Sequence, residues 1–284
     1  MSGHLIGLIG SGIATSLSPA LHEREADHHG LRYLYKIIDI AELGVDAGAA
    51  GDLVRTARRL GYTGLNITHP CKQTVIEHLD ELSPDAARLG AVNTVTFEGD
   101  RAIGHNTDWT GFAESFARGL PDAAAHRVVQ LGAGGAGSAV AHSLLTLGAD
   151  RVTLVDARAD RAESLAAELT ERFGPGRAHA AAPADLESSL RHADGLVNAT
   201  PVGMAAHPGS PVPGELLRPD LWVADVVYRP LRTELLGRAR DIGCRTLDGG
   251  GMVVFQAAHA FRLFTGLSPA TDRMLAHLSA LITA

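Results

Sequence analysis

The sequence has little cysteine and no long hydrophobic run, and both scarcities limit what the protein can be. Cys71 and Cys244 are the only cysteines among 284 residues. They have no CxxC spacing, so neither a disulfide framework nor a zinc ribbon is expected. No apolar run reaches the roughly 18 residues of a membrane span, and residues 1–12 lack the charged start and cleavage pattern of a secretory signal. We therefore expect a cytoplasmic protein without a membrane partner.

Basic charge is scarce as well, and lysine is the scarcer of the two basic residue types. The formal net charge is −7, and no run of five lysines or arginines is present, so no nucleic-acid partner is expected. Of the 25 basic residues only Lys36 and Lys72 are lysines. Because an amine can lose its proton where a guanidinium cannot, both lysines are candidates for chemistry.

Strand and helix patterns alternate along the chain and predict an α/β fold with two lobes. The first series has strands at residues 5–9, 33–40, 64–68, 91–97 and 101–105, with helices beginning at Ser18 and covering 52–60 and 72–82. It favours a mostly parallel sheet with helices on both faces. A connecting helix over 108–120 leads to a second series, with strands at 127–131, 151–156, 196–199 and 222–227 and helices at 138–147, 160–172, 252–264 and 271–282.

From this organisation we predict two domains with a cleft between them. Residues 1–108 would form an α/β substrate domain, and residues 109–251 a Rossmann-type dinucleotide-binding domain. The helices of residues 252–284 would pack back toward the first domain.

A glycine-rich loop marks the cofactor site of the second lobe. The predicted strand 127–131 runs directly into Gly132-x-Gly134-x-x-Gly137, and a helical pattern follows. The first glycine permits a tight turn, the second lets a phosphate approach the backbone, and the third allows close packing of helix on strand. The free N–H groups of the helix start would bind the pyrophosphate. The loop residues predicted to bind the cofactor are Gly132, Gly134, Gly135, Ala136 and Gly137.

An acidic residue in the second lobe bears on the choice of dinucleotide. Asp156 ends a predicted strand about 20 residues beyond the last glycine, where a carboxylate binds the ribose hydroxyls. A carboxylate there repels a 2′-phosphate, so NAD is the expected cofactor. Arg158 and Arg161 follow closely and could each bind a phosphate or stack on adenine, so NADP remains an alternative.

Polar residues gather at strand ends of the first lobe. Ser16-x-Ser18-Pro19 places two hydroxyls beside a helix start, which suits a carboxylate, although a simple N-cap serine would also explain Ser18. The other polar groups are Asn66-x-Thr68-x-Pro70-x-Lys72, Asn93-Thr94 and Asn106-Thr107-Asp108. Each alone is typical of a turn. Together they indicate a site for a polyhydroxylated acid.

These segments resemble the shikimate dehydrogenase family, and the resemblance covers nearly the whole chain. Its further pieces are Gly90-Ala91-Val92-Asn93-Thr94, Asn198-Ala199-Thr200-Pro201, Asp225-Val226-Val227-Tyr228-x-Pro230 and Gly249-x-x-Met252-x-x-x-Gln256. Such a resemblance implies reversible NAD(P)-dependent oxidation of the ring 3-hydroxyl of shikimate or quinate, to 3-dehydroshikimate or 3-dehydroquinate.

The resemblance also assigns roles to residues. It implies that Lys72 and Asp108 are the catalytic pair, with the proton carrier left open between them. It implies that the substrate carboxylate is bound by Ser16, Ser18 and Tyr228, and that the ring hydroxyls are bound by Asn66, Thr68, Asn93 and Gln256. On the cofactor side it adds Thr200, Gly249 and Met252.

Several features look like the NAD-using quinate/shikimate branch of the family, among them Asp156-Ala157-Arg158 and Gly104-His105-Asn106. That branch often has threonine where this chain has Ser18, which leaves the preference among shikimate, quinate and aminoshikimate open. Alternative functions are an aminoshikimate dehydrogenase, a folate- or glutamyl-tRNA-linked dehydrogenase of the same plan, and a non-catalytic shikimate-binding regulator. No metal is expected, because the histidines lack ligand spacing. The protein would be a monomer or a homodimer.

Overall fold

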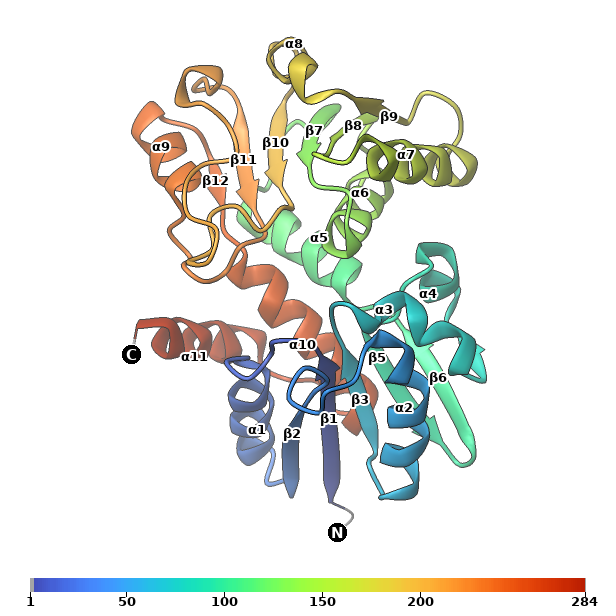
Figure 1. The fold of residues 1–284 in the computed structure, drawn as a ribbon. Coiled ribbons are helices and arrows are strands. Elements are labelled where there is room, and N and C mark those ends of the chain that lie inside the picture. Colours follow the sequence, from blue (N-terminus) through green and yellow to red (C-terminus); the bar gives the residue numbers. More distant parts are fainter. Residues whose placement is uncertain (1–2, 284) are drawn as a thin grey trace. The chain divides into compact units, whose positions relative to one another are not determined.

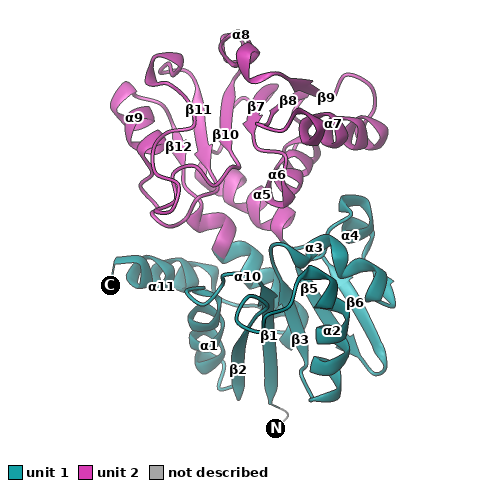
Figure 2. Cartoon of the chain, in the orientation of Figure 1, with its two compact units in different colours: residues 1–107, 254–284 teal, residues 108–253 magenta. Residues whose placement is uncertain are grey.

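The computed structural model describes residues 3–283, which divide into two compact units (Figures 1 and 2). Unit 1 comprises residues 1–107 and 254–284, and unit 2 comprises residues 108–253. Each unit is built around its own six-stranded sheet. Across the described residues, no helix is both long and apolar enough to cross a membrane.

Unit 1 contains a mixed sheet with the strand order β2-β1-β3-β5-β6-β4. β1, β2 and β3 are parallel, whereas β5 runs antiparallel to both β3 and β6. The mostly parallel sheet that the sequence predicted is thus interrupted by the β5–β6 hairpin, whose turn contains Gly99 at φ +59°. The strands are β1 (His4–Gly10), β2 (Tyr33–Asp39), β3 (Gly64–Ile67), β4 (Glu81–Leu82), β5 (Thr94–Glu98) and β6 (Arg101–His105).

Helices cover both faces of this sheet, and each face has its own apolar core. On one face, Val54 and Ala57 of α2 pack in a cluster with Leu65 and Ile67 of β3. On the other, Phe261 of α10 belongs to a cluster with residues of β1 and β2. The helices are α1 (Ser18–His28), α2 (Ala50–Arg59), α3 (Cys71–Thr74), α4 (Pro84–Leu89), α10 (Gly250–Thr265) and α11 (Thr271–Thr283), with the 3-10 helices η1 (Ala47–Ala49) and η2 (Ile76–His78).

The helix predicted over residues 72–82 is wrong in its second half. The helical conformation ends at His78, and Leu79 is extended with φ −105° and ψ 146°. The N–H of Asp80 donates to the carbonyl of Ala102 at 2.9 Å, and β4 then pairs in parallel with β6. Pairing with a distant strand therefore overrides the local helical pattern.

Unit 2 contains an all-parallel sheet with the order β12-β11-β10-β7-β8-β9. The chain proceeds outward from β7 in one direction through β8 and β9, and in the other through β10, β11 and β12, which is a doubly wound arrangement. The strands are β7 (Arg127–Leu131), β8 (Arg151–Val155), β9 (Ala178–Ala181), β10 (Gly195–Asn198), β11 (Trp222–Asp225) and β12 (Thr246–Leu247). Apolar clusters cover both faces.

The helices of unit 2 include one that the sequence patterns did not predict, α9. Its boundaries carry ordinary signals: Thr233 caps the start by accepting from the N–H of Leu236, and Gly243 ends it in the left-handed region. The short elements β9, β12 and α8 were also missed. The helices are α5 (Asp108–Gly119), α6 (Gly135–Thr146), α7 (Ala159–Phe173), α8 (Leu186–Leu190) and α9 (Glu234–Ile242), with the 3-10 helices η3 (Pro183–Asp185) and η4 (Gly214–Leu216).

Candidate active site

Strand directions explain why the polar segments of unit 1 gather at one edge of its sheet. β1, β2 and β3 are parallel, so their carboxyl ends share an edge. β5 runs the opposite way and therefore begins at that edge, and β6, antiparallel to β5, ends there. The segments that carry Ser16, Thr68, Asn93 and Thr107 all adjoin this edge.

An acidic residue that the sequence analysis missed shapes the loop after β1. Asp39, the last residue of β2, accepts hydrogen bonds from the N–H groups of Gly12 at 2.9 Å, Ile13 at 2.7 Å and Ala41 at 3.0 Å. Burial acts to raise the pKa of Asp39, but these backbone hydrogen bonds lower it below its ordinary value. The carboxylate thereby fixes the loop that leads to Ser16.

The serine pair is not explained by helix capping. Leu17 is the N-cap of α1, and no side chain caps that helix. Instead the hydroxyl of Ser16 donates to that of Ser18 at 3.2 Å, and the N–H of Ser18 donates to the Ser16 hydroxyl at 3.3 Å. Both hydroxyls are half-buried. The two serines are therefore held together beside the first turn of α1.

The two predicted asparagines of unit 1 belong to one buried network. Asn66 lies opposite Thr94 in the β3–β5 register, and its Nδ2 donates to Thr94 Oγ1 at 3.1 Å and to the carbonyl of Asn93 at 3.2 Å. Asn93 Oδ1 in turn accepts from the N–H of Thr107 at 2.7 Å. Cross-strand pairing thus orients both amides.

The remaining residues that the sequence analysis assigned to the substrate and to catalysis belong to different units. Lys72 is half-buried on α3, and its carbonyl accepts from the N–H of Val92 at 2.9 Å. Gln256 is half-buried on α10 in unit 1. Asp108 is buried at the first position of α5 in unit 2. Tyr228, also in unit 2, has its pKa raised by burial, against a smaller lowering effect of Arg229.

The glycine loop of unit 2 lies at the point where strand order reverses, between β7 and its neighbour β10, which is where doubly wound sheets bind ligands. Gly132 has φ +95°, and a Cβ there would lie 2.6 Å from the carbonyl oxygen of Ala199. At Gly137 a Cβ would lie 2.2 Å from the Gly132 oxygen, whereas at Gly134 it would meet no atom within 4 Å. A side chain at Gly132 or Gly137 would collide with the backbone, so glycine is required at both positions. At Gly134 the absence of a side chain leaves space beside the loop.

A buried amide that the sequence analysis did not single out holds this loop in shape. Gln130, on β7, is fully buried, and its Nε2 donates to the carbonyls of Gly132 at 2.8 Å and Gly137 at 2.9 Å. No side chain caps α6, whose N-cap is Gly134, so the N–H groups of its first turn remain for an anion. The loop carbonyls are hydrogen-bonded to Gln130, and the N–H groups at the start of α6 are not capped by a side chain. This arrangement suits the pyrophosphate of a dinucleotide.

Asp156, directly after β8, connects to the same loop. Its Oδ2 accepts from the N–H of Ala133 at 2.8 Å and its Oδ1 from that of Arg158 at 2.8 Å. The exposed Arg158 guanidinium pairs with Asp160 at 2.5 Å, and this hydrogen bond holds the pKa of the Asp160 carboxyl below its usual range. Arg161 is exposed in the first turn of α7. The positive charge of Arg158 is therefore already offset by an acid.

A second network orders the loops after β10 and β11. Asn198 accepts from the Thr200 hydroxyl at 2.6 Å and donates to Asp225 at 2.9 Å. Asp225 also accepts from the hydroxyl of Thr233 at 2.7 Å. Burial raises the pKa of Asp225 despite these hydrogen bonds. The loops carrying Thr200 and Tyr228 are consequently linked.

Gly249 and Met252, which the resemblance placed on the cofactor side, follow β12. A Cβ at Gly249 would lie 2.4 Å from the carbonyl oxygen of Val226, so this position allows close approach of two backbone segments. Met252 is buried in the core cluster that also contains Phe112 and Trp222.

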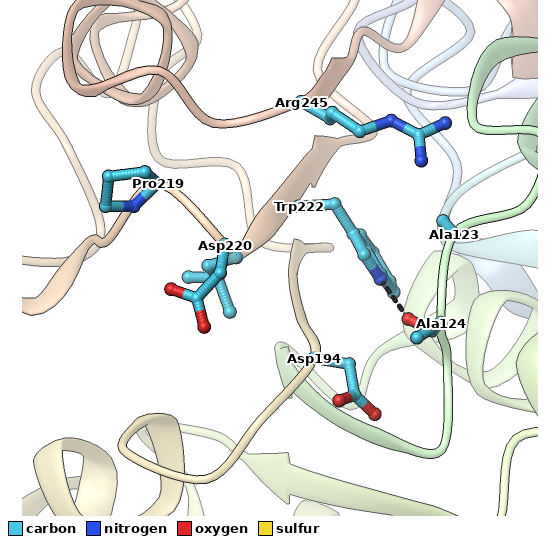
Figure 3. Close-up of a pocket in the computed structure, with 8 residues that line it drawn as sticks. Ala123, Ala124, Asp194, Pro219, Asp220, Trp222 and Arg245 are labelled. Carbon is cyan, nitrogen blue, oxygen red and sulfur yellow. Dashed lines mark hydrogen bonds between the residues drawn. The ribbon is translucent and has the colours of Figure 1, made fainter.

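Unit 2 also contains a cavity lined by residues that include Asp194, Trp222 and Arg245 (Figure 3). Asp194 and Trp222, which line it, stand at the amino ends of β10 and β11, whereas ligands of parallel sheets bind at carboxyl ends. Inside the cavity wall, Trp222 Nε1 donates to the carbonyl of Ala124 at 2.7 Å. This cavity is therefore separate from the glycine loop.

Histidines do not form a metal cluster in the part of the chain that the structure describes. No group of three or more His, Cys, Asp or Glu side chains within residues 3–283 is arranged to hold an ion. His22 is fully buried, and its Nδ1 shares a hydrogen bond with the hydroxyl of Tyr33 at 3.0 Å. Burial lowers the pKa of His22 to about 3, so this imidazole is a neutral core residue.

The sequence of this chain is similar to those of known dehydrogenases. Residues 8–95 match the model of the shikimate dehydrogenase substrate-binding domain, and residues 128–205 match that of the saccharopine dehydrogenase NADP-binding domain. A shikimate dehydrogenase (NADP(+)) of Streptomyces avermitilis is 68% identical over 278 residues, which are 98% of this chain and 96% of the relative. The chain belongs to the shikimate dehydrogenase family.

Other relatives include members of the NAD-using branch. A quinate/shikimate dehydrogenase (NAD(+)) of Corynebacterium efficiens is 48% identical over 273 residues, covering 96% of each chain. The solved structure of quinate dehydrogenase from Corynebacterium glutamicum in complex with NAD aligns with a TM-score of 0.93 and 44% identity, covering 98% of this chain and 99% of that one. The predicted family and the two-lobed α/β fold are confirmed.

Proposed function

We propose that this protein is a nicotinamide-dependent dehydrogenase that reversibly oxidises the ring 3-hydroxyl of shikimate, of quinate, or of both. The observation that carries the proposal is the hydrogen-bonded polar edge of the unit 1 sheet, which suits a ring acid with several hydroxyls. Unit 1 would bind the substrate, and unit 2 the dinucleotide. Family membership and the glycine loop support the same activity.

The cofactor side of the proposal depends on the glycine loop and Asp156. The N–H groups at the start of α6 would bind the pyrophosphate, and the Asp156 carboxylate would accept hydrogen bonds from the ribose hydroxyls. We propose NAD as the preferred cofactor, because a carboxylate repels a 2′-phosphate and the guanidinium of Arg158 is paired with Asp160. The names of the relatives divide between NADP(+) and NAD(+), so NADP is the second candidate.

On the substrate side, Ser16, Ser18 and Tyr228 would bind the carboxylate by hydrogen bonding. The ring hydroxyls would be bound by Asn66, Thr68, Asn93 and Gln256. These side chains combine hydroxyls with amides, which both donate and accept, as ring hydroxyls require.

The chemistry requires removal of a proton and of a hydride from the same carbinol. The dinucleotide, when bound to unit 2, would supply the acceptor for the hydride. We propose that Lys72 or Asp108 would receive the hydroxyl proton, and a positioned acid–base group of this kind accelerates such a step by about 10²–10⁴-fold. The hydroxyl loses its proton and the carbon its hydride, which leaves a ring ketone and a reduced dinucleotide.

Initial rates test the proposal directly. The full chain would be assayed with NAD and with NADP at saturating shikimate, quinate and aminoshikimate. We expect reduction of the dinucleotide with shikimate or quinate, and a higher kcat/KM for NAD. A higher kcat/KM for aminoshikimate would reassign the substrate. Binding of a ring acid without turnover would instead indicate a non-catalytic regulator.

A further inference from the structure

Two tyrosines on β2, Tyr33 and Tyr35, each have a buried hydroxyl that is hydrogen-bonded to a side chain. The partner is an amide for Tyr35 and an imidazole for Tyr33. Tyr35 is 7% exposed, and its hydroxyl donates to Asn66 Oδ1 at 2.7 Å. Tyr33, two residues earlier on the same face, is 8% exposed and shares a hydrogen bond with His22 Nδ1 at 3.0 Å. Of the two hydroxyls, that of Tyr35 is hydrogen-bonded to a residue of the proposed substrate set.

The hydrogen bond from Tyr35 determines what Asn66 can offer to a ligand. Asn66 Nδ2 faces the carbonyl of Asn93, which can only accept, so the amide cannot be reversed without losing that bond. The second hydrogen of Nδ2 is donated to Thr94 Oγ1. With both amide hydrogens used and Tyr35 donating to Oδ1, the second lone pair of Oδ1 is what Asn66 can present. Asn66 would therefore accept from a ring hydroxyl.

Ser18, one of the paired serines, affects the pKa of the Tyr35 hydroxyl. Burial raises the pKa of Tyr35, and a hydrogen bond with the Ser18 side chain acts in the opposite direction. Ser18 in turn accepts from Ser16 at 3.2 Å. A hydrogen-bonded series thus leads from Tyr35 through Asn66 to Asn93, and the two serines form a separate hydrogen-bonded pair.

We propose that Tyr35 is a positioning residue for the ring substrate, acting by fixing the amide of Asn66. The inference rests on the proposed function, because it concerns the same substrate site. Tyr35 touches neither substrate nor cofactor in this role. Its loss would weaken substrate binding and leave dinucleotide binding unchanged.

Tyr35→Phe tests this role, and Tyr33→Phe is its matched control. Each change removes one buried hydroxyl from the same strand face, so the two variants should lose similar thermal stability. We expect Tyr35→Phe to raise the KM for shikimate or quinate by about threefold to tenfold, the range for one neutral hydrogen bond, with the KM for NAD unchanged. For Tyr33→Phe we expect both KM values within twofold of wild type.

A double variant shows whether Tyr35 acts through Asn66. In the Asn66→Ala background, Tyr35→Phe should change the substrate KM little, because coupled residues are non-additive. An unchanged substrate KM in Tyr35→Phe, an equal rise in Tyr33→Phe, or full additivity with Asn66→Ala would overturn the inference. Wild-type turnover with the ring acids tests the proposed function separately, since it does not depend on Tyr35.

Discussion

The carboxylate of Asp156 accepts a hydrogen bond from the backbone N–H of Ala133 at 2.8 Å, so the end of β8 is bound to the glycine loop. One side chain consequently supports the shape of the loop and presents negative charge where the ribose is expected. These two effects can be separated by substitution, because an amide can still accept from the Ala133 N–H but carries no charge.

Asp156→Asn should therefore shift cofactor preference. We expect the ratio of kcat/KM for NAD to that for NADP to fall by about tenfold or more, since a hydrogen bond to a charged group contributes about 1.5–3 kcal/mol and repulsion of the 2′-phosphate also disappears. Asp156→Ala should in addition raise the KM for both dinucleotides, because the loop loses its acceptor. An unchanged ratio in both variants would show that Asp156 does not select the cofactor.

Two alanine substitutions in the glycine loop should behave differently. Gly137→Ala places a Cβ 2.2 Å from the Gly132 oxygen, so we expect a lower Tm together with a higher KM for NAD. Gly134→Ala meets no atom within 4 Å, so its Tm should equal that of wild type, while the methyl group hinders the pyrophosphate and raises the KM. Thermal denaturation and initial rates check both. A wild-type KM for NAD in Gly134→Ala would show that the pyrophosphate does not bind at this loop.

The two lysines provide a matched pair for the chemical step. Lys72→Ala should lower kcat by about 10²–10⁴-fold, the range for loss of a general acid–base group, with little change in NAD affinity. Lys36→Ala, at an exposed position of β2, should retain wild-type kcat. Steady-state kinetics and calorimetric NAD titration give both quantities. Near-normal turnover of Lys72→Ala would contradict its assignment.

An ion pair between the buried Glu25 of α1 and the partly exposed Arg273 of α11 should make stability depend on pH. The carboxylate of Glu25 accepts hydrogen bonds from the guanidinium of Arg273 at 2.6 and 2.9 Å. It also accepts one from the backbone N–H of Ala270 at 2.8 Å. Burial alone would raise the pKa of Glu25, but these contacts bring it below its ordinary value of 4.5. Because the folded pKa is the lower one, the stabilisation is complete above about pH 4.5 and is lost as pH falls through the folded pKa.

Glu25→Gln should accordingly lower the free energy of unfolding at neutral pH by about 1–3 kcal/mol, with the partial exposure of Arg273 favouring the low end. The Tm difference from wild type should narrow as pH falls below 4.5. Glu98→Gln, in an exposed pair with Arg101 at 3.6 Å, should change Tm little at any pH. A difference for Glu25→Gln that is constant with pH would show that ionisation does not matter.

Contiguous signals made the glycine loop predictable from the sequence. The glycines, the strand before them and the acid after the next strand are all read from local order, and the structure places Asp156 on the loop through Ala133. The substrate residues were predicted by resemblance to a family. Strand direction, with β5 antiparallel to β3, explains why their segments adjoin one edge.

Residues whose roles depend on pairing between distant segments could not be found in this way. Asp39 and Tyr35 have ordinary strand contexts, and their partners become neighbours only through the pairing of strands. The same cause explains the wrong helix over 79–82, where pairing with β6 decides the conformation. Gln130 was missed for another reason, because its partners Gly132 and Gly137 are close in sequence but no motif marks the amide that binds them. Edge strands of two to four residues, such as β12 and β9, are too short to show a period.

Hydride transfer from the ring carbinol is the central claim, and deuterium tracing tests it most directly. Shikimate carrying deuterium at the 3-carbon would be incubated with NAD and the full chain, and the products examined by NMR and mass spectrometry. The account predicts 3-dehydroshikimate and a reduced nicotinamide that carries the deuterium. Failure to form reduced dinucleotide from shikimate or quinate, or formation of NADH without the label, would contradict it.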